Sequence, residues 1–334
     1  MPDVGISVGG HMSTIADLAK LAEDGGYESI WVAETAYSAF VQAALAIDAT
    51  SHVKVGTNIA LAFPRSPTIT AMTARDLAEL SGDRFILGLG SQVKRVNEQR
   101  FSVEFEHPAP KMAEYVEVVR EVLRTFGGEK VNHEGRFYNV TMNPFPGAGP
   151  VGDIPIYIAA VNSKMVEASG RVADGVLGHP LTSPKWITEV VRPALETAAK
   201  EAGRDPTDIS LTNSVILQLN DDKERARFEA ALQIAFYATT RTYTPVLALH
   251  GFDDRVPAIR EAFSRGDLPE MANIALPMVD TYAITGPEDE CRERLAEFDG
   301  IIDRVVIGSA WVGPDQQAIA ENYKRILNTF RPAG

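Results

Sequence analysis

Short runs of Val, Ile and Leu alternate along the chain with longer segments whose apolar residues recur at helical spacing. Near-continuous apolar runs are typical of strands buried on both faces, as in a parallel sheet covered by helices. Eight such units in series favour a single-domain (β/α)8 TIM barrel over residues 1–334. The predicted strands span residues 4–9, 29–34, 53–63, 84–90, 154–160, 175–179, 209–219 and 303–309.

The segments between these runs predict helices. In residues 14–25, Ile15, Leu18 and Ala22 fall on one face, and the glycines that follow supply a stop. The other predicted helices span residues 39–50, 68–81, 111–126, 164–173, 184–202, 221–238, 287–298 and 314–330. Alternating strands and helices of this length indicate βα units rather than an all-helical or all-β fold.

Two stretches depart from the repeat. Residues 127–152 carry a polar run and then a Pro/Gly cluster, which predicts a small hairpin with a loop. Residues 239–282 contain one helical piece, 256–264, before the eighth unit. We interpret both as insertions into the barrel. A doubly wound nucleotide-binding sheet is the competing architecture, but its glycine fingerprint after Gly88 and Gly90 fails at Val93.

Composition restricts the partners. The chain has 32 Lys and Arg against 45 Asp and Glu, which gives a formal net charge of −13. Such a surface repels phosphate backbones and anionic lipid, so neither nucleic acid nor a membrane is expected as a partner. The lone Cys291 and the lack of a signal-like leader or a long apolar run predict a cytoplasmic protein. No metal ligands are predicted.

A TIM barrel carries its chemistry at the carboxyl ends of its strands. Most of the predicted strands end in a hydrogen-bonding side chain, so we expect these residues to meet on one rim. Glu34 is the strongest single candidate, because an acidic residue at a barrel mouth must be solvated, paired or used. The rim candidates are His11, Glu34, Thr35, Asn58, Ser91, Gln92, Asn162, Ser163, Lys164, His179 and Ser309.

The segment 81–95 carries the strongest local signal. A buried strand that ends in Gly90, Ser91 and Gln92 exposes backbone amides and two side-chain donors, and two basic residues follow at 94 and 95. Residues 162–164 open the helix after the fifth strand and offer amides to the same anion. These features predict a phosphate cradle. The alternative interpretation is a strand whose glycines serve only packing, followed by a basic turn that is merely solvated.

Five blocks of sequence, taken in order, point to a known family. They are GYESIWVAE (26–34), FPRSP (63–67), RFILGLGSQ (84–92), IYIAA (156–160) and DGVLGHP (174–180). Over nearly the whole chain, this order and spacing resemble the luciferase-like monooxygenase superfamily, and within it the oxidoreductases that depend on the deazaflavin coenzyme F420. The resemblance implies a TIM barrel with insertions, often a homodimer, that binds a flavin or deazaflavin at the strand ends.

The resemblance also implies roles for single residues. It places a non-prolyl cis peptide near Asn58 and Ile59, behind the cofactor ring, and Glu34 near the same cofactor. The cofactor's linker and phosphate would lie at Gly90, Ser91, Gln92, Val161, Asn162 and Lys164. Thr35 and Val93 stand where related sugar-phosphate and alcohol dehydrogenases have His and Glu. Their proton relay therefore does not carry over, and a phosphorylated sugar is not expected as substrate.

We therefore predict hydride transfer between the deazaflavin and a small organic substrate. His11 or His179 would donate or accept the proton, because a neutral-range pKa suits both directions. Two alternatives stay open, namely an FMN-dependent two-component monooxygenase and a non-catalytic barrel that binds a flavin or deazaflavin. The candidates for an apolar wall around the substrate, or for ordinary core packing, are Phe40, Phe63, Phe137 and Tyr243.

Overall fold

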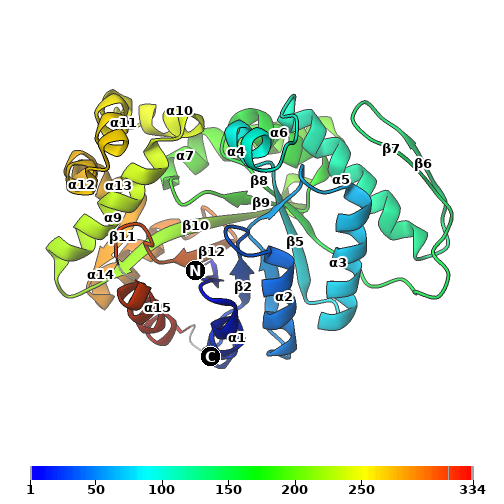
Figure 1. Ribbon diagram of the computed structural model, residues 1–334, viewed down its shortest axis with the longest axis horizontal. Coiled ribbons are helices and arrows are strands. Elements are labelled where there is room, and N and C mark those ends of the chain that lie inside the picture. Colours follow the sequence, from blue (N-terminus) through cyan, green and yellow to red (C-terminus); the bar gives the residue numbers. More distant parts are fainter. Residues whose placement is uncertain (1, 315, 332–334) are drawn as a thin grey trace.

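Eight parallel strands close into a barrel in the computed structural model, which describes residues 2–314 and 316–331. Each strand pairs with the next, and the sheet closes where β9 pairs with β10 (Figure 1). Closure confirms the predicted (β/α)8 barrel and excludes a doubly wound open sheet. The strands are β1 (Asp3–Val8), β2 (Ser29–Val32), β3 (Lys54–Thr57), β5 (Phe85–Gly90), β8 (Ile156–Ala159), β9 (Gly175–Gly178), β10 (Ser210–Leu219) and β12 (Arg304–Gly308).

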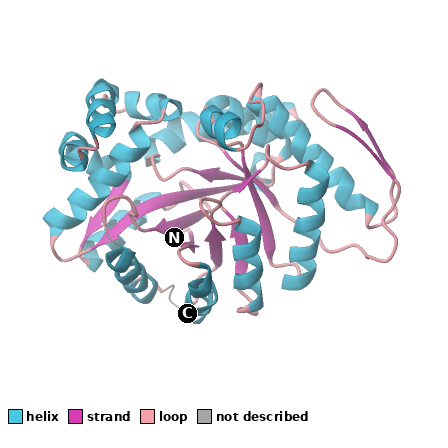
Figure 2. Cartoon of the chain, in the orientation of Figure 1, coloured by secondary structure: helices cyan, strands magenta, loops and turns pink. Residues whose placement is uncertain are grey.

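Helices surround this barrel (Figure 2). The third shows why the boundaries fall where they do, since Ser66 caps its first turn, Pro67 opens it and Gly82 ends it in the left-handed conformation, with φ 63°. The predicted helix at 184–202 is instead three pieces, because a π-helical turn at Ile187–Val191 separates α7 from α8. The helices of the barrel are α1 (Ile15–Asp24), α2 (Ala39–Asp48), α3 (Pro67–Ser81), α4 (Lys94–Arg100), α5 (Pro108–Thr125), α6 (Ser163–Val172), α7 (Pro184–Trp186), α8 (Arg192–Glu201), α9 (Lys223–Ala238), α14 (Glu288–Leu295) and α15 (Gln316–Thr329).

The stretch at 127–152 contains an antiparallel hairpin of β6 (Val131–Glu134) and β7 (Asn139–Met142), which stands away from the barrel in Figure 1. The stretch at 239–282 holds four helices instead of the one expected, namely α10 (Thr244–Ala248), α11 (Val256–Arg265), α12 (Leu268–Ala275) and α13 (Val279–Tyr282). It leads into an unexpected strand, β11 (Ala283–Gly286), which pairs in parallel with the last residues of β10.

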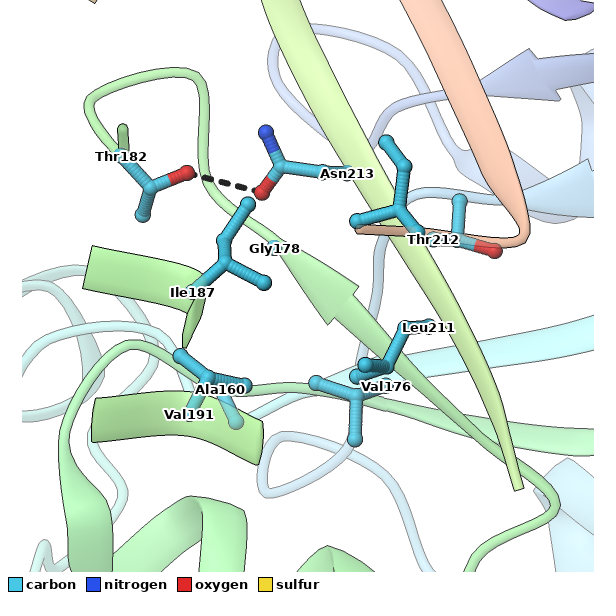
Figure 3. Close-up of a pocket in the computed structure, with 10 residues that line it drawn as sticks. Ala160, Val176, Gly178, Thr182, Ile187, Val191, Leu211, Thr212 and Asn213 are labelled. Atoms are coloured by element: carbon cyan, nitrogen blue, oxygen red, sulfur yellow. Dashed lines mark hydrogen bonds between the residues drawn. The ribbon is translucent and has the colours of Figure 1, made fainter. Parts of the chain in front are cut away.

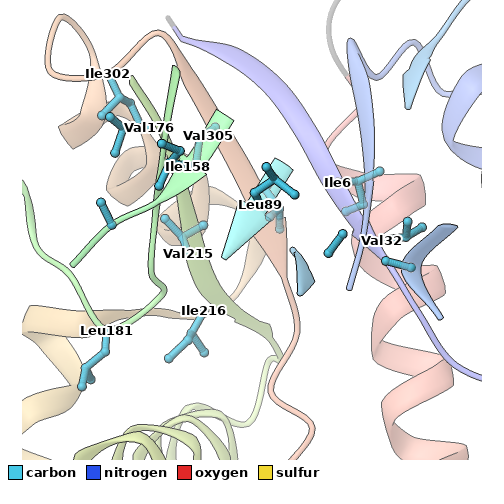
Figure 4. Close-up of a cluster of buried hydrophobic side chains, with 14 of the residues drawn as sticks. Ile6, Val32, Leu89, Ile158, Val176, Leu181, Val215, Ile216, Ile302 and Val305 are labelled. Carbon is cyan, nitrogen blue, oxygen red and sulfur yellow. The ribbon is translucent and has the colours of Figure 1, made fainter. Parts of the chain in front are cut away.

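The main core lies between the barrel and the helices. Side chains on the outer face of the strands fill it, including Ile6, Val32, Leu89, Ile158 and Val305, all nearly inaccessible to water (Figure 4). Burial on this scale is the dominant stabilising contribution to a fold of this kind. None of the helices within residues 2–314 and 316–331 has the length and apolarity of a membrane span.

A smaller apolar cluster fills the barrel interior: Trp31, Ile86, Tyr157, Leu177 and Val306. Below it, Arg304 opens β12, bonds to Glu28 at 2.7 Å and lies over the indole of Trp31. Large side chains therefore close the amino-terminal end of the barrel. Toward the carboxyl end the inward positions carry small residues, among them Ser7, Gly88, Ser214 and Gly308. Any ligand inside the sheet must enter at this end, which we call the mouth.

Candidate active site

The third strand is interrupted at the mouth. β3 ends at Thr57 and β4 (Ala60–Leu61) resumes the pairing with β5, while the peptide bond between Asn58 and Ile59 is cis, as the resemblance implied. Thr57 replaces the missing ladder, since its Oγ1 donates to the Gly88 carbonyl at 2.7 Å and accepts from the Gly88 amide at 2.9 Å. The side-chain amide of Asn58 reaches across the barrel, where its Nδ2 donates to Ser214 Oγ at 3.0 Å.

Glycines on β5 make room for this interrupted segment. A Cβ at Gly90 would lie 1.9 Å from Ile59 Cδ1, and a Cβ at Gly88 would lie 1.8 Å from the Thr57 carbonyl oxygen. Both distances are far below van der Waals contact. At Gly88 the obstacle is backbone, so only glycine allows Thr57 to lie this close to β5, whereas at Gly90 a larger residue would force the Ile59 side chain to shift. Ile59 is half-buried, and it presents an apolar surface at the mouth beside Gly90.

Glu34 is fully engaged by the same segment. Its carboxylate accepts hydrogen bonds from the Leu61 amide at 2.8 Å and from Arg65 Nη1 at 2.7 Å and Nη2 at 2.5 Å. Its backbone amide donates to the Ile59 carbonyl at 3.0 Å. The side chain therefore fastens the interrupted strand to the end of β2, and its charge is compensated by a bidentate arginine.

The predicted phosphate cradle comes from two neighbouring loops. β5 and β8 pair directly, so the residues that follow them lie side by side at the mouth. Gln92 adopts a left-handed backbone, with φ 57°, and its Oε1 accepts from the Val93 amide at 2.9 Å. Ser91 and Val161 are half-buried beside it.

The second of these loops begins helix α6. Asn162 is its N-cap and accepts from the Met165 amide, which leaves the preceding amides of the first turn facing the loop. Lys164 is exposed and forms no ion pair with any residue in the described part of the chain. A free ammonium next to a capped helix start is suited to binding an anion.

The two candidate histidines differ sharply. His11 is exposed and caps its own turn, with its Nδ1 at 2.8 Å from Ser13 Oγ. His179 is half-buried against Tyr243 and Tyr237, with ring centroids 4.3 and 4.5 Å away. Burial lowers the pKa of His179 to about 3. His179 was proposed from sequence as a proton donor or acceptor because a histidine usually has a pKa near neutrality. With a pKa of about 3 it does not fit that role, and its imidazole is uncharged in the folded protein.

The tautomer of His179 follows from its contacts. Nδ1 accepts from the Leu181 amide at 3.0 Å, so the proton of the neutral ring is on Nε2. The side chain is thus a hydrogen-bond donor. Of the aromatic residues considered from sequence, only Tyr243 contacts this histidine; Phe40 lies under Arg65, Phe63 under Lys111, and Phe137 beside Arg136 of the hairpin.

Two important residues were missed by sequence reasoning. Arg65 lies inside the FPRSP block, and a lone arginine between prolines was the only signal for it. Asn97 is fully buried in α4, and its Nδ2 donates to the Ser91 carbonyl at 2.8 Å and to the Val93 carbonyl at 3.2 Å. It holds the loop of the cradle, but a polar residue on a short helix gives no such indication in the sequence.

Two cavities lie away from this site. One of about 10 Å³ lies behind β9 and β10, where Thr182 donates to Asn213 (Figure 3). It can hold one water molecule at most. The other, of about 210 Å³, lies between β10, α9 and α15. None of the predicted site residues lines either of them.

Comparison with known proteins decides the family. The sequence profile described as luciferase-like monooxygenase matches residues 2–305. The chain belongs to this family. An uncharacterized protein of Mycobacterium tuberculosis (strain H37Rv) is 37% identical over 309 residues, 90% of this chain and 91% of that protein. A 5,10-methylenetetrahydromethanopterin reductase of Methanolobus tindarius is 32% identical over 312 residues, 91% of this chain and 92% of that enzyme.

A solved structure gives the same result at the level of the backbone. The coenzyme F420 dependent tetrahydromethanopterin reductase from Methanopyrus kandleri matches with a TM-score of 0.79 and 26% identity, covering 98% of both chains. The luciferase-like match at residues 2–305 includes every predicted site residue except Ser309.

Proposed function

We propose that this luciferase-like protein is an F420-dependent oxidoreductase that transfers a hydride between the deazaflavin and a small organic substrate. The observation that carries the proposal is the close approach of Ile59 to Gly90, which places the apolar Ile59 side chain at the carboxyl end of the barrel, beside the loops that follow β5 and β8. Reductases at 32% identity, and a coenzyme F420 dependent one of matching fold, support this reading.

The residues at the mouth fit the cofactor. Two small inward residues, Ser7 and Gly308, leave room at the carboxyl end of the barrel, since the atoms nearest to a Cβ at Gly308 would be 3.6 and 3.7 Å away. Ile59 would support one face of the deazaflavin ring. The phosphate would lie between the two loops after β5 and β8, bound by Ser91, Gln92, Val161, Asn162 and Lys164, because these loops supply hydroxyl, amide and ammonium donors.

A bound deazaflavin supplies the hydride chemistry itself, and the chain supplies position and surroundings. Glu34 holds the interrupted strand through Arg65 and the Leu61 amide. We therefore assign it a positioning role in place of the catalytic role considered from sequence. His179 offers a neutral Nε2–H donor at the mouth, which stabilises negative charge on a substrate oxygen without giving up its proton.

Titration of the purified protein with oxidised F420 and, separately, with FMN tests the proposal. We expect binding of F420, and a loss of affinity of about 10-fold in Lys164→Ala, in line with one charge-assisted phosphate contact. Lys130→Ala is the matched control, since Lys130 is also exposed and unpaired in the described chain but lies at the hairpin. Tight FMN binding without F420 binding would overturn the proposal in favour of the flavin-dependent monooxygenase.

Turnover separates an enzyme from a binding protein. With reduced F420 and an organic electron acceptor, absorbance of the oxidised deazaflavin should rise only when the protein is present. F420 binding with no turnover of any acceptor would favour the non-catalytic barrel. The homodimer and the cytoplasmic location stay predictions, and sedimentation of the purified protein would test the first.

A further inference from the structure

Six aromatic rings form an unbroken series of contacts from the end of β9 to the outside of the protein. His179 stacks on Tyr243 at 4.3 Å and meets Tyr237 edge-on at 4.5 Å. Phe236 continues the series to Trp311 at 5.4 Å and to Phe263 at 6.3 Å. We call this series of rings the aromatic wall, and its members are His179, Phe236, Tyr237, Tyr243, Phe263 and Trp311.

The outer rings of the wall are exposed to water. Trp311 is 51% exposed and Phe263 is 46% exposed, which is unusual for side chains of this size. The loop that carries Trp311 is nevertheless held firmly. Gln233 Oε1 accepts from the backbone amides of Trp311 and Val312 at 3.0 and 3.1 Å. The indole is therefore presented to solvent by a fixed backbone.

The wall is uncharged over the whole working range of pH. Burial lowers the pKa of His179 to about 3 and raises the pKa of Tyr237 to about 12. Burial also raises the pKa of Tyr243. The six rings themselves carry no charge, so a charged ligand would lose hydration against them, whereas an uncharged flat one gains stacking area.

The wall begins next to the proposed cofactor loops, since β8 and β9 pair directly, and it lies across the barrel from the segment of Ile59, where Asn58 donates to Ser214 of β10. His179 follows β9, and Trp311 follows β12, with β10 between these two strands. The loops with Ser91 and Lys164 follow β5 and β8. A molecule lying on the wall would therefore face a ring supported by Ile59, and its oxygen could accept from His179 Nε2–H.

We propose that the aromatic wall is the substrate site and that it selects uncharged, planar, conjugated carbonyl compounds such as enones and quinones. This inference rests on the proposed function. In the reduction, the substrate receives a hydride from reduced deazaflavin and a proton from water, so two electrons leave the cofactor, which ends oxidised, and the conjugated system is reduced by two electrons. His179 keeps its proton and donates a hydrogen bond to the carbonyl oxygen that gains charge.

The test measures steady-state kinetics of the F420-loaded enzyme with menadione, with cyclohexenone and with the anionic naphthoquinone sulfonate. We expect kcat/KM for menadione to exceed that for the sulfonate by about 10-fold or more, because the sulfonate would lose hydration against uncharged rings. In Trp311→Leu, KM for menadione should rise about 3- to 10-fold with kcat nearly unchanged, as for loss of one stacked ring. KM for the smaller cyclohexenone should rise less.

Matched variants give the readouts that a merely structural role would not change. Leu268 lies in the 239–282 insertion, as Phe263 does, but it does not belong to the wall. Leu268→Ala removes a 40% exposed apolar side chain there and should leave KM unchanged. His179→Phe keeps the ring and loses the donor, so kcat for menadione should fall about 10-fold or more. His179→Gln, which keeps an N–H donor, should retain more of kcat. The Kd for F420 should stay the same in all of these variants.

The outcomes separate the two proposals. Equal kcat/KM for menadione and the sulfonate, or an unchanged KM in Trp311→Leu, would overturn the wall as substrate site while F420 binding stands. A dimer that dissociates in Trp311→Leu without a change in KM would assign the wall to subunit contact and overturn it as well. Calorimetry of menadione with cofactor-free protein tests the case in which the protein does not bind F420. Binding of menadione to the wall in that case would contradict the proposed function and leave the wall as a ligand site.

Discussion

The carboxylate of Glu34 accepts two hydrogen bonds from the guanidinium of Arg65, although these residues belong to different βα units. The pair is largely shielded from water, with side-chain exposures of 11% and 25%. It joins the end of β2 to the residues that follow β4, directly beside the cis bond at Asn58. The ion pair therefore helps to hold the interrupted third strand at the mouth, together with the bond from the Leu61 amide to Glu34.

Substitution at Glu34 tests the contribution of this ion pair. Glu34→Gln keeps the shape of the side chain but loses the charge that Arg65 requires, so we expect the free energy of unfolding to fall by about 1.5–3 kcal/mol. Urea unfolding measures it. The control is Arg265→Ala, which breaks the exposed pair of Arg265 with Glu261 and should change stability little. An equal loss in the two variants would show that the Glu34 pair is an ordinary surface contact.

Alanine scanning of the two glycines of β5 tests the close approach of residues 57–59. Gly88→Ala places a methyl group on the Thr57 carbonyl, which is backbone and cannot yield, so we expect a loss of about 3 kcal/mol or more. Gly90→Ala meets the side chain of Ile59, with Cδ1, Cγ1 and Cβ at 1.9, 3.0 and 3.3 Å, and this side chain can shift, so the substitution should cost less, about 1–2 kcal/mol, and also weaken F420 binding. Gly149→Ala has open space around the new methyl group and serves as control. A larger loss of stability in Gly90→Ala than in Gly88→Ala would contradict this packing.

The pH dependence of stability tests the burial of His179. Its pKa is about 3 in the folded protein, below its unfolded value of about 6.5, so acid protonates the unfolded chain first. Stability from this residue is complete above pH 6.5 and is lost as the pH falls toward 3. Between pH 7 and pH 5 the wild type should lose about 2 kcal/mol more than His179→Gln. Parallel curves for the two proteins would mean that the imidazole is solvated.

The hairpin should depend on one carboxylate of α5. Glu114 accepts from the amides of Arg136, Phe137 and Tyr138 at 3.1, 2.8 and 2.7 Å. We expect Glu114→Ala to speed hydrogen exchange in residues 131–142 and to leave the barrel strands protected, as a local opening would. Glu129→Ala removes an exposed acid near the hairpin without such contacts and should leave the exchange unchanged. A uniform increase over the whole chain would instead indicate global destabilisation.

Much of the architecture could be predicted because periodicity is a local property. Each of the eight barrel strands is a compact apolar run, so all eight were found. β11 was missed because Ala283–Gly286 carries only two apolar residues and gains its place from pairing with β10. The helices at 239–282 were mostly missed for a similar reason, since they are short and separated by prolines and turns.

The site divides in the same way. Residues at strand ends could be placed on one rim, because a barrel brings them there. The partner of Glu34, the buried Asn97 and the stacking of His179 on Tyr243 come from packing between distant segments, which spacing does not record. The pKa of His179 likewise depends on neighbours far along the chain. Sequence therefore identified the rim, while the charge states and pairings needed the structure.

A crystal structure of the protein soaked with oxidised F420 tests the central claim most directly. The proposal predicts the deazaflavin ring at the mouth against Ile59, and the phosphate within hydrogen-bonding distance of the loops that carry Ser91 and Lys164. The opposite face of the ring should look toward His179. A cofactor bound elsewhere, or a mouth that stays closed to the ring at saturating F420, would contradict the account.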